Sequence, residues 1–184
     1  MSEQLNELAE IIRRRSLRRG EFVLASGRKA NYYLDCRMTT LDPRGATLIG
    51  RLILARLREL KIDAEAIGGL TMGADPIAAA TAVVSEMEGR PLPAFIVRKE
   101  AKSHGMQRSI EGWDGKPGAK VVVVDDVCTS GDSILIACRK AEEDGYSVAA
   151  TLCVVDREEG GTQAVASRYP FYPLLTARQL LDDA

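Results

Sequence analysis

The sequence predicts an α/β fold in which helices cover both faces of a central parallel β-sheet. Short apolar runs typical of strands alternate with helical segments from residue 43 to residue 155. The run at 121–124 consists of valine alone, and strands that are apolar on both sides are typical of a sheet buried on both faces. Gly89 and Gly145 follow two of the helical segments, where glycine commonly ends a helix. This alternation favours parallel strands, whose ligands bind beyond the carboxyl ends of the sheet.

Length and composition indicate one globular domain over residues 1–184. Apolar residues make up 46% of the chain, charged residues make up 28%, and the formal net charge is −1. These values argue against disorder and against a general affinity for nucleic acid. The first twenty residues lack the continuous apolar stretch of a signal peptide, and no run is apolar enough to span a membrane, so we expect a cytoplasmic protein.

The cysteines do not form a metal-binding or disulfide pattern. The four cysteines are scattered at positions 36, 128, 138 and 153 without a C-x-x-C pair, and the single histidine is His104. Because zinc sites need closely spaced cysteine or histidine ligands, we predict that the cysteines are free thiols.

The first 40 residues are predicted to form a helix and a small flap. Apolar residues recur at helical spacing between residues 5 and 12, which predicts an amphipathic helix that ends near Gly20. The segment 21–36 has the pattern of two short strands around a turn at Ser26 and Gly27. The expected result is an antiparallel flap ahead of the main sheet.

A long helix should follow the flap, because Asp42 can cap it and Pro43 suits its first position. Beyond it, strands are predicted at 66–70, 94–97, 121–124 and 148–155, and helices at 76–88 and 132–144. The remaining long stretch, residues 98–118, has no periodicity. Loops of that length are usually functional, and we interpret this one as a mobile loop over the ligand site.

The stretch VVVVDDVCTSGDS, residues 121–133, predicts a site for a sugar phosphate. Asp125 and Asp126 should emerge at the carboxyl end of a buried strand, and Thr129, Ser130 and Gly131 lead into a helix. The free N–H groups and positive dipole end of that helix suit a phosphate. Two carboxylates would repel a bare phosphate, so the ligand must bring hydroxyl donors or a divalent cation, and a ribose diol can supply the hydroxyl donors.

Residues 121–133 closely resemble the phosphoribosyl-diphosphate motif of type I phosphoribosyltransferases. RKEAKSHG, residues 98–105, is similar to the catalytic loop of the orotate phosphoribosyltransferase family. Three further segments resemble the same family: FVLASGRKANYYLDCR at 22–37, its motif over the base; GGLTMGADPIAAA at 68–80, its pyrophosphate loop; and VVDREEGG at 154–161, which contains Arg157. The resemblance covers about residues 20 to 161. It implies the type I fold, with residues 1–40 as the base-covering hood and 98–118 as the catalytic loop.

The resemblance also implies a reaction and a set of site residues. The reaction is the Mg²⁺-dependent transfer of the 5-phosphoribosyl group from 5-phosphoribosyl 1-diphosphate (PRPP) to orotate, which gives orotidine 5′-phosphate and diphosphate in pyrimidine biosynthesis. The implied catalytic residues are Lys102, His104, Asp125 and Asp126. The implied substrate-binding residues are Arg98, Lys99, Lys102, His104, Asp125, Asp126, Val127, Cys128, Thr129, Ser130, Gly131, Asp132, Ser133 and Arg157.

Arg157 suits the orotate carboxylate, because a planar guanidinium can bind a carboxylate through two parallel hydrogen bonds that uracil lacks. The metal is expected to bind mainly through the substrate rather than through protein side chains. The family also implies a homodimer in which each catalytic loop reaches the neighbouring site. No nucleic acid or membrane partner is expected.

Two alternatives stay open at this level. A purine or uracil phosphoribosyltransferase is disfavoured by the flap motif and by Arg157. A non-catalytic PRPP sensor would need a nucleic-acid-binding element, for which the run RRRSLRR at 13–19 is the candidate. The chain also departs from some family members, because Ala25, Met72 and Gly73 stand where those members carry a lysine or a tyrosine–lysine pair.

Overall fold

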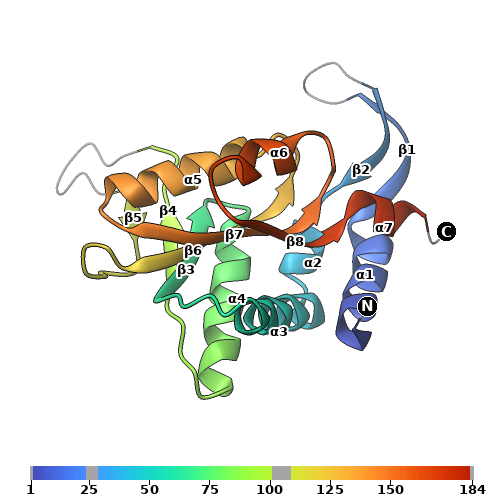
Figure 1. The fold of residues 1–184 in the computed structure, drawn as a ribbon. Helices are drawn as coiled ribbons and strands as arrows, with labels where there is room; N and C mark the ends of the chain where they lie inside the picture. Colours follow the sequence, from blue (N-terminus) through green and yellow to red (C-terminus); the bar gives the residue numbers. More distant parts are fainter. Residues whose placement is uncertain (1, 24–28, 101–108, 183–184) are drawn as a thin grey trace.

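The computed structural model describes residues 2–23, 29–100 and 109–182 and confirms the predicted α/β fold (Figure 1). The helices are α1 (Glu3–Arg15), α2 (Arg37–Thr40), α3 (Pro43–Glu59), α4 (Ala74–Met87), α5 (Asp132–Glu143), α6 (Gly161–Ala166) and α7 (Ala177–Leu181). The strands are β1 (Leu17–Val23), β2 (Lys29–Leu34), β3 (Ala66–Leu70), β4 (Ala94–Val97), β5 (Ile110–Glu111), β6 (Lys120–Cys128), β7 (Ser147–Asp156) and β8 (Phe171–Thr176). Within these ranges, no helix is both long and apolar enough to cross a membrane.

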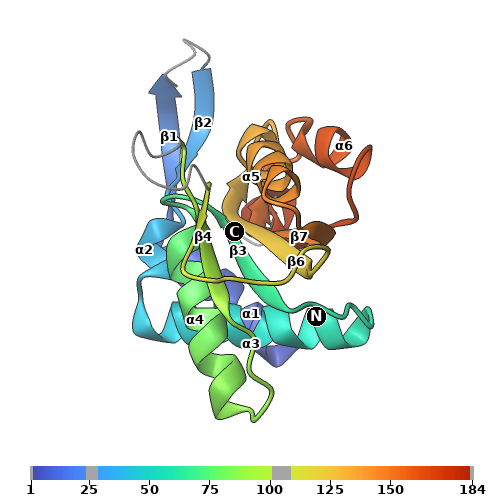
Figure 2. The ribbon, with the colours of Figure 1, turned by 90° about the vertical axis from the view of Figure 1, so that its left-hand side faces the viewer.

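The main sheet has six strands in the order β5-β4-β3-β6-β7-β8. Its strands pair in parallel except β5, which is antiparallel to β4. Helices α3 and α4 lie on one face and α5 and α6 on the other, while the β1–β2 hairpin projects beyond the sheet (Figures 1 and 2). The carboxyl ends of β3 and β6 therefore meet at one edge, as the strand–helix alternation predicted.

Alternating side chains of β6 build the two hydrophobic cores. Val122 and Val124 pack into the core with α1, α3 and α4, whereas Val121 and Val123 pack into the core with α5 and α6. All four valines are at most 1% exposed. A strand buried on both faces has no position for a polar residue, which explains the uninterrupted valine run.

The structure changes three expectations about element ends. The first helix ends at Arg15 rather than near Gly20, because residues from Leu17 onward pair with β2 instead of continuing the helix. The stretch 98–118 is not wholly irregular, since β5 pairs with β4 inside it. The strand predicted at 121–124 continues to Cys128, so Asp125 and Asp126 lie within it, and Val127 pairs with Val155 of β7.

Two other expectations are confirmed. The four cysteines are buried free thiols. The flap is an antiparallel hairpin, with Leu17 opposite Leu34 and Arg19 opposite Tyr32, although its expected turn at Ser26 and Gly27 lies outside the described residues. The sequence did not reveal α6, β8 or α7, which close the far edge of the sheet beyond β7.

Helix α3 begins where the sequence predicts. Asp42 has an extended backbone, and its Oδ1 accepts hydrogen bonds from the N–H groups of Arg44 at 3.1 Å and Gly45 at 2.9 Å. Pro43 occupies the first turn, where a missing N–H group costs nothing. The helix then buries Leu48, Ile49 and Ile53 against the sheet.

We predict that Asp42→Ala lowers the free energy of unfolding by about 1 kcal/mol, because two N–H groups at the start of α3 lose their acceptor. Urea unfolding followed by circular dichroism measures the change. Asp42→Asn is the matched control, since its amide oxygen accepts the same bonds and should retain most of the stability. Equal losses in both variants would contradict the capping role.

Candidate active site

A cavity of about 360 Å³ opens at the carboxyl ends of β3 and β6. Its walls come from five segments far apart in the sequence: the end of β2 with the start of α2, the turn after β3, the segment after β4, the end of β6 with the turn that follows it, and the residue after β7. The lining residues include Asp35, Arg37, Thr71, Met72, Gly73, Lys99, Asp125, Asp126, Val127, Thr129, Ser133 and Arg157. The structure thus brings seven of the predicted site residues together in one cavity.

The turn from Thr129 to Ser133 forms a smaller adjoining cavity of about 120 Å³. Gly131 has a φ of +85° at the N-cap of α5, a left-handed conformation that favours glycine. No side chain caps this helix end, and the Ser130 hydroxyl donates instead to Asp132 Oδ2 at 2.7 Å. An uncapped helix start around a small cavity is suited to an anion.

Two glycines allow α6 to support this turn from behind. The Gly161 N–H donates to the Thr129 carbonyl at 3.0 Å. A Cβ atom on Gly161 would lie 2.5 Å from Cys128 Sγ, and one on Gly131 would lie 2.7 Å from Val165 Cγ2. Side chains at either position would push α6 away from the turn. In the sequence, Gly161 appeared only as the last residue of the family segment 154–161. The glycine pair at 160–161 was the one local pattern that could have drawn attention to it.

Asp125 and Asp126 are two adjacent carboxyl groups, of which the first is buried and the second half-buried. Asp125 is 7% exposed; its Oδ1 accepts from the Asp126 N–H at 3.0 Å, and Asp126 Oδ1 accepts from the Val127 N–H at 2.8 Å. Burial, followed by the neighbouring Asp126 charge, raises the pKa of Asp125 to about 7. Burial also raises the pKa of Asp126, and Arg37 partly opposes that rise. The pair is therefore poised to accept hydrogen bonds and positive charge from a ligand.

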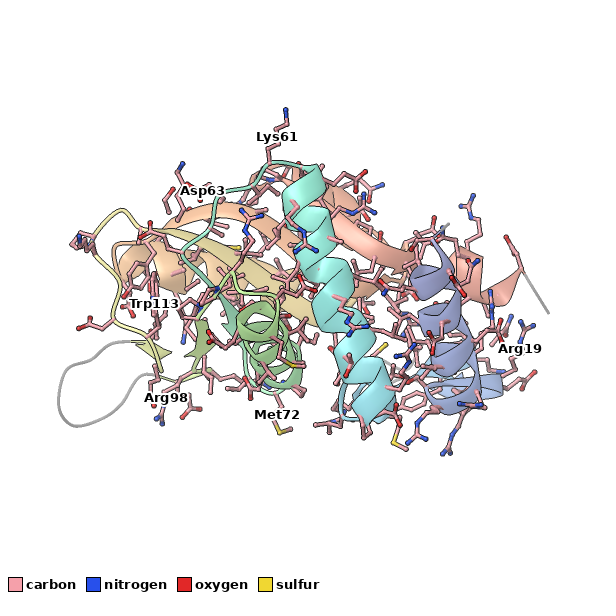
Figure 3. The ribbon with its side chains drawn as sticks, turned by 90° about the horizontal axis from the view of Figure 1, so that it is seen from below. Arg19, Lys61, Asp63, Met72, Arg98 and Trp113 are labelled. Carbon is pink, nitrogen blue, oxygen red and sulfur yellow. The ribbon has the colours of Figure 1, made fainter. Side chains whose placement is uncertain are left out.

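The turn after β3 lies directly over these carboxylates. A Cβ atom on Gly73 would overlap Asp125 Oδ1 and would lie 2.7 Å from Asp126 Oδ1. The Thr71 N–H donates to the Val97 carbonyl at 3.0 Å, which ties the turn to β4. Met72 is 66% exposed and points away from the body of the molecule (Figure 3). Glycine at 73 is thus a packing requirement in this chain, where some family members carry a larger residue.

Arg157 lies between the main cavity and a second one of about 650 Å³ beside the hairpin. Its side chain is 9% exposed, its Nη2 lies 2.7 Å from Glu159 Oε1, and its guanidinium stacks 4.8 Å from the centre of the Tyr32 ring. Within the described residues its buried Nε has no hydrogen-bond partner. A buried guanidinium with an unused donor is suited to a carboxylate ligand.

Arg37 is a residue that the sequence did not single out. Its guanidinium binds Asp35 through two hydrogen bonds, with Nε 2.8 Å from Oδ1 and Nη2 3.0 Å from Oδ2, and both residues line the cavity. The hydrogen bonds from Arg37, together with its charge, lower the pKa of Asp35, and its charge also lowers the pKa of Asp126 against the effect of burial. The pattern that could have identified Arg37 is its position at the end of the flap motif, two residues after Asp35, whose carboxylate it binds.

The basic loop residues are only partly described. Lys99 lines the cavity. Arg98 instead forms an ion pair with Glu111 at 2.9 Å, and Figure 3 shows it at one end of the molecule. Its predicted contact with substrate stays a prediction. Lys102 and His104 lie outside the described residues.

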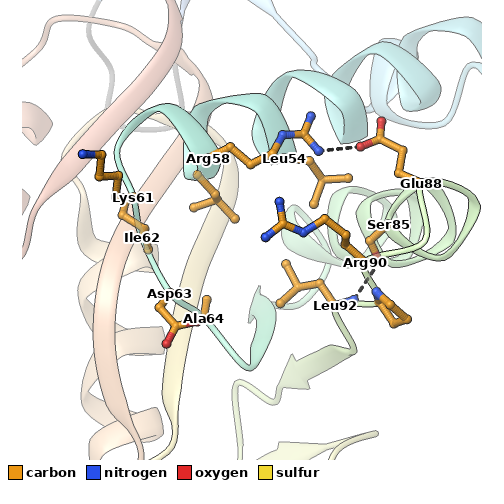
Figure 4. A pocket seen from close by; sticks show the side chains of 12 residues that line it. Leu54, Arg58, Lys61, Ile62, Asp63, Ala64, Ser85, Glu88, Arg90 and Leu92 are labelled. Atoms are coloured by element: carbon orange, nitrogen blue, oxygen red, sulfur yellow. Dashed lines mark hydrogen bonds and ion pairs between the residues drawn. The ribbon is translucent and has the colours of Figure 1, made fainter.

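A further cavity of about 580 Å³ lies between the C-terminal ends of α3 and α4 (Figure 4). Arg58 there pairs with Glu88 at 2.6 Å, and Leu54, Ile62 and Leu92 contribute apolar surface. This cavity is at the edge of the sheet opposite the carboxyl ends of the strands, and no predicted site residue lines it. Its size alone therefore does not make it the functional site.

The fold and the site define a type I phosphoribosyltransferase. No protein-family model matches the chain. The chain is 46% identical over 177 residues to the orotate phosphoribosyltransferase of Tropheryma whipplei, covering 96% of this chain and 82% of that protein. It is 44% identical over 171 residues to that of Rhodopirellula baltica, covering 91% of this chain and 88% of that one.

Solved structures similar to this chain belong to the same family as these relatives. The crystal structure of Mycobacterium tuberculosis orotate phosphoribosyltransferase in complex with Fe(III) dicitrate matches with a TM-score of 0.85 at 42% identity, covering 97% of this chain and 99% of that one. The same enzyme in complex with PRPP matches with a TM-score of 0.80 at 37% identity, covering 96% and 98%. This chain belongs to the orotate phosphoribosyltransferase family.

The raised pKa of Asp125 predicts a specific dependence of stability on pH. The folded protein holds this proton more tightly than the unfolded chain, so ionisation of Asp125 costs stability as pH rises from about 4 to about 7. Asp125→Asn should therefore stabilise the ligand-free protein by on the order of 2–4 kcal/mol at pH 8. The gain should shrink towards pH 4.

Thermal unfolding of both proteins at pH 4, 6 and 8 measures this effect. Asp63→Asn is the control, because Asp63 is exposed at the opposite edge of the sheet and should change little at any pH. A gain for Asp125→Asn that does not vary with pH would show that burial of its charge is not the cause.

Proposed function

We propose that this chain catalyses the transfer of the 5-phosphoribosyl group from PRPP to orotate, forming orotidine 5′-phosphate and diphosphate for pyrimidine biosynthesis. The observation that carries the proposal is the juxtaposition of three groups around one cavity: the anion-binding turn 129–133, the adjacent Asp125–Asp126 pair, and Arg157. The turn fits the 5′-phosphate, the carboxylates fit the ribose diol, and Arg157 fits the carboxylate of the base.

The bond changes assign a task to each group. The bond between ribose C1 and diphosphate oxygen breaks, a bond from C1 to a ring nitrogen of orotate forms, and that nitrogen releases its proton. Positive charge grows on the ribose ring as the diphosphate leaves, and the Asp125 and Asp126 carboxylates lie where they can stabilise it. The turn 129–133 and Arg157 hold the two reactants in line, so the reaction proceeds within one bound complex.

Negative charge develops on the diphosphate as it leaves, and nearby positive charge is needed to neutralise it. Mg²⁺ supplies part of that positive charge when bound. Asp125 and Asp126 offer the oxygen donors that Mg²⁺ prefers. Among residues 2–23, 29–100 and 109–182, no group of three histidine, cysteine or acidic residues suited to a metal occurs. We propose that substrate oxygens supply most of the metal's ligands. Lys99, Lys102 and His104 are the proposed protein groups that neutralise the leaving group, with Lys102 the most directly.

We further propose that the enzyme is a cytoplasmic homodimer in which the loop 98–118 of one subunit serves the site of the other. The support is the resemblance of residues 98–105 to the family's catalytic loop. Sedimentation measurements test the assembly. Recovery of activity on mixing an Asp125→Asn protein with a Lys102→Ala protein tests the sharing of sites.

Part of the basic run 13–19, the candidate nucleic-acid element of the PRPP-sensor alternative, makes contacts within the protein. Arg13 donates to the carbonyls of Leu180 and Gln179, and Arg19 donates to that of Leu181. These arginines therefore tie the N-terminal segment to α7 at one end of the molecule (Figure 3). Their contacts support a structural role for this basic run.

The decisive assay follows the loss of orotate absorbance with PRPP and Mg²⁺ present. Uracil, hypoxanthine and adenine are tested in parallel. Turnover of orotate alone is the expected result. Turnover of another base only would overturn the assignment of orotate, and binding of PRPP without any turnover would favour a sensor.

For the specificity residue, we predict that Arg157→Ala raises the KM for orotate by on the order of 10- to 100-fold, because a charged two-point hydrogen bond is lost. The KM for PRPP should stay within about twofold. Arg157→Lys keeps the charge but loses the fork of donors, so it should restore only part of the affinity. Steady-state kinetics with each substrate varied measure this, and an unchanged KM for orotate would contradict the carboxylate assignment.

A further inference from the structure

Helix α5 connects the anion-binding turn to the two described ends of the catalytic-loop segment. Its first turn, at Asp132, borders the small cavity, and its 12 residues extend the helix over about 18 Å. Its last turn and C-cap carry Lys140 and Asp144, neither of which any motif or family resemblance singled out. Both side chains point to backbone groups of the segment that contains residues 98–111.

Lys140 holds the incoming end of that segment. Its Nζ donates to the carbonyl oxygen of Arg98 at 2.6 Å and to that of Lys99 at 2.8 Å. These two carbonyls directly follow β4, just before the chain reaches residues 101–108. One ammonium group can donate to two consecutive carbonyls only when both point towards it. The two hydrogen bonds therefore restrict the direction in which the backbone leaves the sheet.

Asp144 holds the returning end. Its Oδ2 accepts from the Ile110 N–H at 2.9 Å, at the first residue of β5. The two ends are also joined to each other, since the Arg98 N–H donates to the Ser109 carbonyl at 3.0 Å and the Arg98 side chain pairs with Glu111. Both ends of the loop segment are thus fastened to the same end of one helix.

We propose that Lys140 and Asp144 are positioning residues for catalysis: they fix where the segment carrying Lys102 and His104 leaves and rejoins its own subunit, and so how that segment reaches the neighbouring site that it is proposed to serve. The inference rests on the proposed function. A displacement of about 1 Å in a charged group is enough to weaken a transition-state contact substantially. Substrate binding at the turn and at Arg157 needs neither residue, so the effect should fall on turnover.

The first test compares variants of one helix turn. Lys140→Met should lower kcat about tenfold or more while the KM for PRPP and orotate changes less than about threefold. Lys140→Arg, which keeps a cationic donor, should recover most of the turnover. Arg139→Met is the matched control, because it removes an exposed cation from the adjacent position and should leave kcat unchanged. Asp144→Ala should resemble Lys140→Met.

The second test separates positioning from general damage. If Lys140 acts through the loop segment, Lys140→Met should cost little further turnover in a Lys102→Ala protein, so the two losses are strongly non-additive. The chain has one tryptophan, Trp113, whose ring lies 5.1 Å from that of Tyr146 beside these contacts, and its fluorescence reports on local order. The emission maximum should shift in Lys140→Met and not in Arg139→Met.

Three outcomes overturn the inference: an unchanged kcat in Lys140→Met, additive losses in the double variant, or a rise in KM as large as the fall in kcat. Failure of the proposed function would look different. In that case the unmodified protein itself would not consume orotate, whereas failure of this inference leaves the unmodified protein active. Thermal unfolding of each variant identifies any protein that has simply lost its fold.

Discussion

The adjacent pair of carboxyl groups at Asp125 and Asp126 is the feature on which the site depends. Burial removes hydration from these acids and brings their charges close together, and the two effects, burial first, raise the pKa of Asp125 to about 7. The surroundings partly offset this cost. Backbone N–H groups donate to both carboxylates, Gly73 leaves room above them, and the Arg37 charge opposes the rise in the pKa of Asp126. A ligand that brings hydroxyl groups and positive charge would relieve the repulsion, which is consistent with the proposed binding of the ribose diol.

The parallel sheet brings the other residues of the site next to these carboxylates. Strands β3, β4 and β6 run the same way, so the turn after each reaches one edge of the sheet. The glycine turn after β3, Lys99 after β4 and the anion-binding turn after β6 all meet there. Arg157 reaches the same edge from the end of β7. The hairpin, which is not part of the sheet, adds Tyr32 over Arg157 and so closes the side where the base is proposed to bind.

Much of this arrangement could be read from local patterns. The valine run, the acid pair and the T-S-G turn are consecutive, so periodicity and turn chemistry alone predicted a strand, an anion site and a helix in the right order. Helix α3 was predicted for the same reason, since its cap and its first proline are neighbours in sequence. Strand length was not predictable, because the carboxylates remain inside β6 only through pairing with β7. The contacts of Gly161 and Lys140 could not be predicted either, since each residue binds backbone 32 to 42 positions away.

The sequence by itself determined the chemical content of the site: which acids, which turn, which arginine, and the family to which their spacing is similar. The acids and the turn lie within a dozen positions of one another, where local conformation follows from side-chain type, whereas the arginine was assigned through the family resemblance. Only the tertiary structure decided which distant groups meet: Gly73 over the carboxylates, Tyr32 on Arg157, and the end of α5 on both ends of the loop segment. Those contacts arise when the sheet assembles and packs against its helices, and no local pattern encodes the distance between segments that touch only after folding.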